Sequence, residues 1–249
     1  MPIHHTANLL PIPILMYHQI EAAPPKGAAF RSLYVSPGAF ARQMLFLSLL
    51  GYRGLSMSDL MPYLTGERSG KVFGITFDDG YLNNLTNALP VLNRHGFSST
   101  CYAVSQQLGK NNEWDRVVGI NQTALMSAPQ LQQWLAGGQE VGAHTRHHVR
   151  LTQVDESISM DEISLCKQEL ESMTGASVLH FCYPYGDYTD VHVAMARAAG
   201  FESVTTTQRS QCHAGIDVMQ LPRVPVVRST SLPLLWLKVA TSYEDRRRA

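Results

Sequence analysis

The chain has 249 residues, 45% of them hydrophobic, and its 20 Lys and Arg balance its 20 Asp and Glu to a formal net charge of zero. A chain of this length can bury a substantial core, most simply as a single domain over residues 1–249. The neutral balance gives no argument for nucleic acid or an anionic membrane as a partner. No segment of the sequence is long and apolar enough to predict a membrane-spanning helix.

The N-terminus and the cysteines bear on the compartment. Residues 1–10 contain no Lys or Arg, and Pro11 and Pro13 interrupt the apolar residues around them. This is a poor signal peptide, so we expect a cytoplasmic protein, or a periplasmic or extracellular one if the chain is a processed form. Four cysteines without CxxC spacing are expected to be free buried thiols: Cys101, Cys166, Cys182 and Cys212.

Strand-like and helix-like segments alternate along the chain. In chain order we expect a strand over residues 12–18, a helix from Ser36 to Gly51, a strand over 72–77, a helix over 85–92 and a strand over 99–104. A helix over 125–135, a strand over 140–144, a helix from Ser159, a strand over 179–183, a helix over 191–199 and strands over 203–207 and 224–227 follow. The Ser159 and Glu162 pair is interpreted as a capping box.

This alternation predicts an α/β fold with parallel strands. Short connections between strands and helices are typical of either an open doubly wound sheet or a barrel, and no linker divides the series. In a barrel, chemistry is located at the C-terminal ends of the strands. The residues at these ends are therefore the first candidates for a site.

Two adjacent carboxylates, Asp78 and Asp79, end the predicted strand over residues 72–77 and precede Gly80. Paired acids at a strand end cost free energy if they are buried without partners. A site in which one carboxylate holds a metal and its neighbour takes a proton needs this arrangement. By itself, Asp-Asp-Gly is equally typical of a turn with an Asx cap.

Imidazoles follow the predicted strand over residues 140–144, with His144 and His148 four residues apart. Alone, these two histidines could belong to a surface loop. Together with Asp79 they form a three-ligand set with an open position, which suits a catalytic divalent metal. His147, which lies between them, is interpreted as structural.

Two further segments end predicted strands on the same rim. His18 ends the first strand, although a lone histidine is more often structural than catalytic. Residues 183–186 follow the strand over 179–183 and could be only a tight turn. Because unrelated segments converge on one rim, a shared site is favoured.

Three motifs resemble those of a known family. Residues 76–80 (Thr-Phe-Asp-Asp-Gly), 144–148 (His-Thr-Arg-His-His) and 183–186 (Tyr-Pro-Tyr-Gly) resemble the first three motifs of the polysaccharide deacetylases, the carbohydrate esterase family 4 enzymes with a NodB homology domain. Residues 13–18 also look like the opening strand of the branch that contains poly-N-acetylglucosamine deacetylases. The similarity spans about residues 12–227 and implies a distorted (β/α)7 barrel.

The resemblance implies a role for each matching position. It makes Asp79, His144 and His148 the ligands of a divalent metal, with Zn²⁺ as the first choice and Co²⁺, Ni²⁺ or Fe²⁺ as alternatives. It makes Asp78 the general base, which a neighbouring cation would hold ionised. The backbone N–H of Tyr185 is the implied oxyanion donor.

The chain departs from the family pattern in two places. Where many members carry an arginine before the third motif, this chain has Cys182, and we predict that Arg223 supplies the missing cation and reaches Asp78. An Arg at such a position can also be only a surface ion pair. The late Leu-x-His segment that supplies the general acid in many members is not visible after Val227. His18 is therefore a candidate acid, alongside a water or a substrate group, and is predicted to face the open coordination position.

The combined interpretation is a metal-dependent hydrolase that removes N-acetyl groups from sugar units of a polysaccharide or oligosaccharide. One alternative is deacylation of an O-acetylated glycan or a small N-acyl compound. Another is a catalytically idle carbohydrate-binding member of the same fold. Retention of Asp78 argues against the idle member, because a binding module needs no base beside its metal ligand, whereas the missing acid argues for it.

Overall fold

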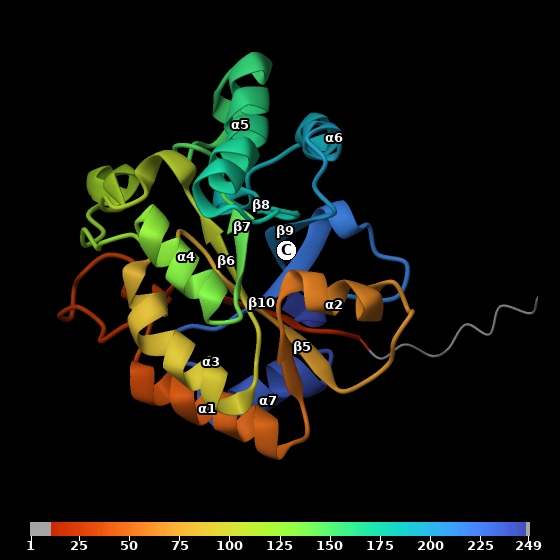
Figure 1. Ribbon diagram of the computed structural model, residues 1–249. Coiled ribbons are helices and arrows are strands. Elements are labelled where there is room, and N and C mark those ends of the chain that lie inside the picture. Colours follow the sequence, from red (N-terminus) through yellow and green to blue (C-terminus); the bar gives the residue numbers. More distant parts are fainter. Residues whose placement is uncertain (1–10, 248–249) are drawn as a thin grey trace, which may run out of the picture.

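The computed structural model describes residues 11–247, so the expectation about a signal peptide in residues 1–10 lies outside the described part of the chain. Strands and helices alternate through this part (Figure 1). The strands are β1 (Ile14–Tyr17), β2 (Gln19–Ile20), β3 (Tyr34–Val35), β4 (Arg53–Leu55), β5 (Val72–Phe77), β6 (Thr100–Ala103), β7 (Glu140–Ala143), β8 (His180–Cys182), β9 (Ser203–Arg209) and β10 (Leu221–Pro225). The α-helices are α1 (Pro37–Leu49), α2 (Met57–Leu64), α3 (Leu89–His95), α4 (Ala128–Ala136), α5 (Glu156–Thr174), α6 (Asp190–Ala198) and α7 (Leu232–Ala240).

Seven parallel strands close into a ring in the order β1, β10, β9, β8, β7, β6, β5. The ring closes because β1 pairs with β10 on one side and with β5 on the other. β4 pairs with the first half of β5, and β2 and β3 form a separate two-stranded sheet. This closure confirms the distorted (β/α)7 barrel and excludes the open doubly wound sheet.

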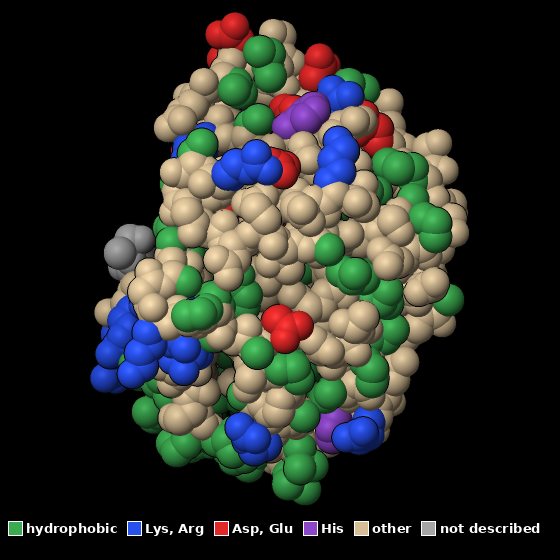
Figure 2. All heavy atoms as spheres, turned by 90° about the vertical axis from the view of Figure 1, so that its left-hand side faces the viewer, with side chains coloured by type: hydrophobic (Ala, Val, Ile, Leu, Met, Phe, Trp, Pro, Cys, Tyr) green, Lys and Arg blue, Asp and Glu red, His purple; other side chains and the backbone are tan. Residues whose placement is uncertain are grey.

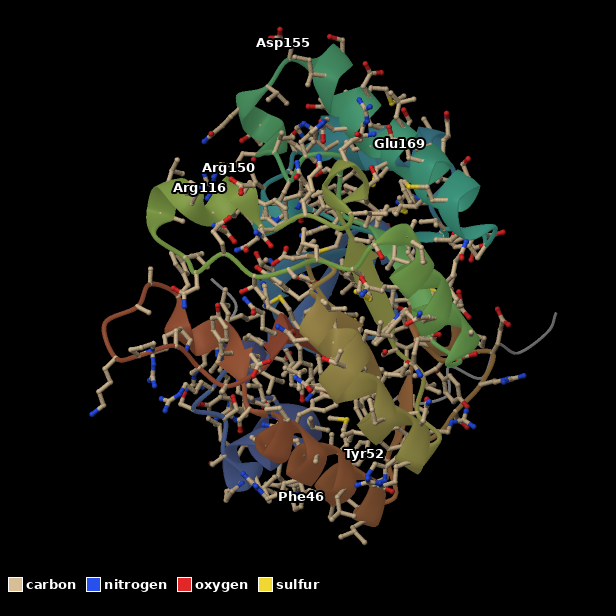
Figure 3. All side chains as sticks on the ribbon, turned by 60° about the vertical axis from the view of Figure 1, so that its left-hand side comes forward. Phe46, Tyr52, Arg116, Arg150, Asp155 and Glu169 are labelled. Carbon is tan, nitrogen blue, oxygen red and sulfur yellow. The ribbon has the colours of Figure 1, made fainter. Side chains whose placement is uncertain are left out.

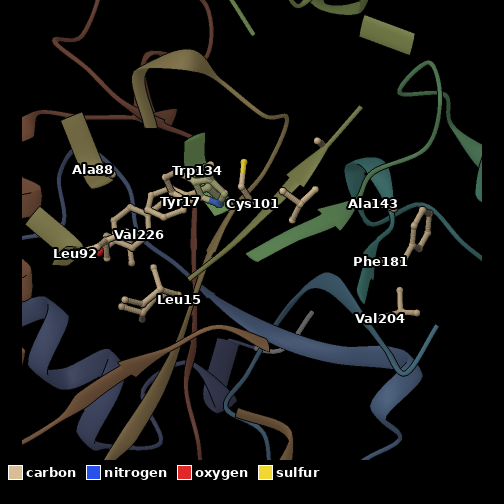
Figure 4. Close-up of a cluster of buried hydrophobic side chains, with 14 of the residues drawn as sticks. Leu15, Tyr17, Ala88, Leu92, Cys101, Trp134, Ala143, Phe181, Val204 and Val226 are labelled. Carbon is tan, nitrogen blue, oxygen red and sulfur yellow. The ribbon is translucent and has the colours of Figure 1, made fainter. Parts of the chain in front are cut away.

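Large apolar side chains from the strands and the surrounding helices fill the core, part of which is drawn in Figure 4. All six residues of β5 are buried, as expected for a parallel strand covered on both faces. The Phe77 ring on β5 packs edge-on against Trp134 of α4 and tilted against Tyr17 of β1, with ring centroids 5.8 and 5.7 Å apart. These contacts lie directly beneath Asp78, so the site rests on tightly packed aromatic residues.

The helices surround the ring, and α1 lies beside both α3 and α7 (Figure 1). α1 begins as predicted, with the Ser36 hydroxyl accepting a hydrogen bond from the Ala39 N–H at 3.3 Å and Pro37 in the first helical position. Within residues 11–247, none of the helices combines the length and the apolar character needed to cross a membrane. Acidic, basic and apolar side chains are interspersed on the face drawn in Figure 2, apart from one group of basic side chains at its edge.

Three helix predictions need correction. α5 begins at Glu156, after Asp155, so Ser159 and Glu162 lie inside the helix and do not form a capping box at its start. The helix predicted from residue 125 begins at Ala128, because residue 125 instead forms a β-bridge with residue 81. The helix over residues 85–92 starts as a π-helical turn and becomes α3 only at Leu89.

The sequence analysis missed several short elements, including β4, α2 and α7. α2 begins after Ser56, whose hydroxyl accepts from the Asp59 N–H at 3.3 Å. α7 begins in the same manner after Ser231, with a proline in its first turn. The four cysteines are free and buried, which confirms the prediction of unpaired thiols.

Candidate metal and catalytic site

The candidate residues come together in one cavity of about 460 Å³ at the C-terminal ends of the strands. Asp78 and Asp79 directly follow β5, His144 directly follows β7, and His18 directly follows β1. The cavity is lined by all four of these residues, and by His148, Arg150 and Tyr185 from the loops after β7 and β8. The structure thus places the groups where a barrel locates its chemistry.

Asp79, His144 and His148 form a buried cluster whose donor atoms all lie within 4.8 Å of one another. The Asp79 Oδ1 atom is 3.4 Å from His144 Nε2 and 3.2 Å from His148 Nε2. Hydrogen bonds from both imidazoles outweigh the effect of burial and hold the pKa of Asp79 well below its usual value. One ionised carboxylate and two imidazoles directed at a common point are a donor set that fits a divalent metal ion.

The two histidines of the cluster are held in different ways. His144 Nδ1 lies 2.7 Å from the Cys182 carbonyl oxygen, so its N–H donates there and Nε2 is left free to bind a metal. His148 Nδ1 is buried and has no hydrogen-bond partner among the described residues. Its ring is instead held between the stacked indole of Trp114 and the edge-on ring of Tyr185, with ring centroids 4.5 and 4.6 Å away.

Asp78 forms a two-point pair with Arg223 on β10. The Nη1 and Nη2 atoms of Arg223 donate to the two carboxylate oxygens of Asp78 at 2.6 and 2.8 Å, which confirms the predicted contact. Burial would raise the pKa of Asp78, but the adjacent guanidinium outweighs it and the pKa is lowered. Arg223 is fully buried and also donates to the Thr206 carbonyl at 2.8 Å, and its Nη2 lies 3.1 Å from Cys182 Sγ.

His18 lies beside this pair and lines the same cavity, as predicted. Its Nε2 atom is 3.9 Å from Asp78 Oδ2, and its side chain is 20% exposed, so the ring faces the cavity and is not buried in the core. Its backbone carbonyl accepts a hydrogen bond from Asn84 at 2.9 Å. The position of His18 allows it to reach a ligand in the cavity, and its role stays a prediction.

The turn Pro184–Gly186 follows β8 and brings Tyr185 to the cavity. Tyr185 has φ 61° and its neighbour Gly186 has φ 67°. A Cβ atom on Gly186 would lie only 1.9 Å from the hydroxyl oxygen of Thr207, so both space and conformation require glycine here. The Arg150 guanidinium lies 3.9 Å above the Tyr185 ring and covers its outer face.

Left-handed backbone is concentrated around the cavity. Within residues 11–247, positive φ angles occur at five residues other than glycine: Phe30, Asp79, Thr145, His148 and Tyr185. Four of these line the cavity, and the fifth, Thr145, follows His144 directly. Each such residue costs about 1–3 kcal/mol, and strain of this kind accumulates where function fixes a side chain.

The loop that carries the two histidines is held from α5. The Glu162 carboxylate accepts hydrogen bonds from the Arg146 and His147 N–H groups at 2.8 and 2.9 Å. Its second oxygen lies 2.5 Å from His147 Nδ1, so His147 points away from the cluster, as predicted. The Thr145 hydroxyl accepts from the His148 N–H at 2.9 Å. Glu162 thus anchors the loop, a role the sequence analysis did not find.

The cavity residues that the sequence analysis missed include two beside the cluster. Trp114 and Asp115 lie in the 3₁₀ turn Glu113–Val118, which connects β6 to α4 over the cavity. Figure 3 shows this turn, marked by Arg116, close to Arg150 on the same side of the molecule. The available signal was an isolated Trp-Asp pair in a polar segment, and it gives no indication of which way the loop folds.

Comparison with known proteins decides the family. The sequence profile described as polysaccharide deacetylase matches residues 65–204, which is more than half of the chain. The chain belongs to the polysaccharide deacetylase family. The matched segment of this polysaccharide deacetylase contains Asp78, Asp79, His144 and His148, whereas His18 and Arg223 lie outside it.

Individual relatives agree with this membership. YxkH of Bacillus subtilis (strain 168), which is named a polysaccharide deacetylase, is 26% identical over 217 residues, covering 86% of this chain and 71% of YxkH. The structure of IcaB from Ammonifex degensii is similar with a TM-score of 0.77 and 25% identity, covering 90% of this chain and 95% of IcaB. The Streptococcus pyogenes deacetylase PplD, solved in complex with acetate, shares the fold with a TM-score of 0.80 and 24% identity. The match covers 92% of this chain and 98% of PplD.

Proposed function

We propose that this polysaccharide deacetylase uses a divalent metal to remove acetyl groups from N-acetylated sugar units of a polysaccharide or oligosaccharide. The observation that carries the proposal is the buried Asp79, His144 and His148 cluster next to an Asp78 that is paired with Arg223. Three protein ligands leave coordination positions open for water and substrate. A carboxylate that is ionised beside such a cluster supplies the base that amide hydrolysis needs.

A divalent ion held by these three side chains would polarise the acyl carbonyl and make water more acidic. Asp78 accepts the proton of the attacking water, and Arg223 keeps its carboxylate ionised and correctly oriented. The Tyr185 backbone N–H donates to the oxygen that becomes negative in the tetrahedral intermediate. His18 gives a proton to the leaving nitrogen, so that the C–N bond breaks and the free amine and acetate are released.

The choice of metal follows from the ligands. A carboxylate with two imidazoles suits Zn²⁺ first, and Co²⁺, Ni²⁺ and Fe²⁺ bind the same donor types. Calcium and magnesium are disfavoured, because both prefer sites made of oxygen ligands. The resident ion is therefore expected to be zinc or a neighbouring transition metal.

The test is metal-restored acetate release. The protein is stripped with a chelator, loaded separately with Zn²⁺ or Co²⁺, and incubated with N-acetylated chito-oligosaccharides. We expect acetate to appear only after metal is added. Binding of the oligosaccharide without acetate release under every metal would favour the idle carbohydrate-binding member instead.

A second candidate is favoured by the apolar rim of the cavity. Phe30, Val117 and Val118 line the cavity and are 54%, 91% and 51% exposed. Such a rim would also suit a small N-acyl or O-acetyl compound with an apolar portion. Hydrolysis of acetylated aryl substrates combined with inactivity on chito-oligosaccharides would favour this second function.

A further inference from the structure

Asp115 is a buried carboxylate in the cavity wall that the reaction described above does not use. It lies in the 3₁₀ turn Glu113–Val118 and is 7% exposed, yet it lines the same cavity as Asp78 and the metal-ligand cluster. No ion pair of Asp115 with a lysine or arginine occurs within residues 11–247. The described residues therefore supply Asp115 with neutral hydrogen-bond donors and with no lysine or arginine.

Asp115 is held rigidly by Asn112, which is itself fully buried. The Asn112 side-chain amide donates to Asp115 Oδ2 at 2.9 Å and to the Asn121 carbonyl at 3.3 Å. The Asn112 side-chain oxygen accepts from the Thr123 N–H at 2.7 Å. A carboxylate on such a support keeps a fixed position, as a binding group must.

The surroundings of Asp115 are unfavourable for its charge. Burial raises the pKa of Asp115 to about 6, and the negative charge of Asp79 acts in the same direction. Hydrogen bonds from Asn112 and from the Tyr81 hydroxyl only partly offset these effects. A carboxylate at this point does not stabilise the fold, whereas it can bind a ligand that carries hydrogen-bond donors.

The position of Asp115 argues against a role as a further metal ligand. It belongs to neither of the described groups whose donor atoms lie within 4.8 Å of one another, one of Asp79, His144 and His148 and the other of Asp78, His144 and Cys182. Its neighbour Trp114 stacks on His148, which places Asp115 next to the cluster and outside it. A ligand in this cavity therefore has both the cluster and this carboxylate in its wall.

We propose that Asp115 binds the substrate by accepting a hydrogen bond from a hydroxyl group of the sugar unit that carries the N-acetyl group. The inference rests on the proposed function and names a substrate-recognition residue for it. A hydroxyl donating to a carboxylate makes a strong, charge-assisted bond. The apolar rim formed by Phe30, Val117 and Val118 packs against the faces of the sugar ring, and Asp115 accepts a hydrogen bond from a hydroxyl group at the edge of the ring.

The experiment compares two substrates that differ in hydroxyl groups. Wild type, Asp115→Ala and Asp115→Asn are assayed with metal on N-acetylated chito-oligosaccharide and on 4-nitrophenyl acetate, which has no hydroxyl. We expect Asp115→Ala to lower kcat/KM on the oligosaccharide by about 10- to 100-fold, mainly through KM, and to leave the aryl ester unchanged. Asp115→Asn keeps an acceptor oxygen without the charge and should show a smaller loss.

Glu113→Ala is the matched control. Glu113 lies two residues earlier on the same turn, is exposed, and pairs with Arg116 at 2.7 Å in solvent. Its removal takes away a carboxylate of the same turn without touching the cavity, so both substrates should be hydrolysed as by wild type. Thermal unfolding of each variant checks that the turn stays folded, and Asp115→Asn should melt no lower than wild type.

The outcomes separate this inference from the proposed function. Equal losses on both substrates would show that Asp115 acts in the chemistry or the fold, and no loss on either would show that it does not bind substrate. Either result overturns the inference while wild-type acetate release leaves the proposed function intact. A wild-type protein that hydrolyses only the aryl ester would defeat the proposed function before any variant is compared.

Discussion

The two halves of the candidate site are built by different physical means. The inner half consists of Asp78, His144 and Arg223, which lie on strands or directly after them. Hydrogen bonds of 2.6–2.8 Å hold them, between Asp78 and Arg223 and from His144 and Arg223 to strand carbonyls. The outer half consists of Trp114, Asp115, His148 and Tyr185, which lie on loops. The His148 ring packs against the rings of Trp114 and Tyr185 with centroids 4.5 and 4.6 Å apart, and Asp115 is held by Asn112. Hydrogen bonds thus fix the inner half, whereas the metal-ligand candidate of the outer half, His148, is held by ring packing.

This difference suggests a division of work. Proton transfer and charge stabilisation need atoms fixed to within fractions of an ångström, which strands and charge-assisted hydrogen bonds provide. Substrate specificity needs cavity walls whose residues can vary between proteins while the catalytic groups stay in place. Loops on a rigid barrel provide such walls. Changes in the inner half should therefore abolish turnover, and changes in the outer half should alter metal or substrate affinity.

Asp78→Asn should have the largest effect. Asparagine keeps the size of the side chain but cannot accept the proton of water, so turnover should fall by roughly 10²- to 10⁴-fold. Bound metal should be unchanged, because Asp79 and the two histidines remain. Acetate release and metal content measured on the same sample check this, and turnover near the wild-type value would remove Asp78 from the mechanism.

Arg223→Met should be the most destabilising change. It leaves Asp78 buried without its cation, and breaking a buried pair in this way costs about 3–5 kcal/mol in the free energy of unfolding. Urea unfolding measures the loss. Combining Arg223→Met with Asp78→Asn removes the unpaired charge and should restore part of the stability. A double variant no more stable than the single one would contradict the argument.

His18→Ala tests the proposed proton donor, which lies beside Asp78 of the inner half. Loss of a general acid should lower turnover by about 10²-fold. Because a protonated imidazole is required, wild-type activity should fall as the pH rises, and this basic limb should be missing in the variant. The pH–rate profile is the measurement, and an identical limb in both proteins would assign the acid to another group.

Trp114→Leu tests whether packing holds His148. Without the stacked indole, the imidazole has no hydrogen bond at Nδ1 to orient it, so zinc affinity should drop by about 10-fold. Trp114→Phe keeps a flat ring and should retain most of the affinity. Competition with a zinc chelator gives both values. If the Trp114→Leu variant binds zinc as tightly as the wild type does, ring packing does not hold His148.

His147→Ala should have the smallest effect. The side chain is 46% exposed and turned toward Glu162, so its loss should change the metal-binding free energy by no more than about 0.5 kcal/mol. His148→Ala, one position away, should strip the metal. Titration of both variants with Zn²⁺ makes the comparison, and equal losses would show that the two histidines have been assigned wrongly.

The inner half was largely readable from the sequence. Asp78, Asp79 and His144 sit in short contiguous motifs at strand ends, so local pattern alone brought them to one rim of the barrel. Arg223 was predicted through the family resemblance, because many members place an arginine where this chain has Cys182. The closed ring itself depended on the family resemblance, since alternation of strands and helices fits an open sheet equally well.

The outer half was not readable in the same way. The nearness of Trp114 and Asp115 to the cluster depends on the path of the connection between β6 and α4, which bridges back to residues near Gly80. No periodic pattern records such a path. Glu162 was assigned to a capping box because its spacing from Ser159 fits one, while its tertiary contact with the histidine loop leaves no local trace.

The position of Arg223 on the last strand has a consequence for how the enzyme is made. Arg223 lies 145 residues after Asp78, and its strand also closes the ring by pairing with β1. On the ribosome, the metal ligands and the base emerge well before β10. A nascent chain can therefore assemble the cluster early, but its base stays without a counter-charge until the final strand docks. We expect a chain truncated before β10 to lack turnover, because it would miss both the counter-charge of Asp78 and the strand that closes the ring.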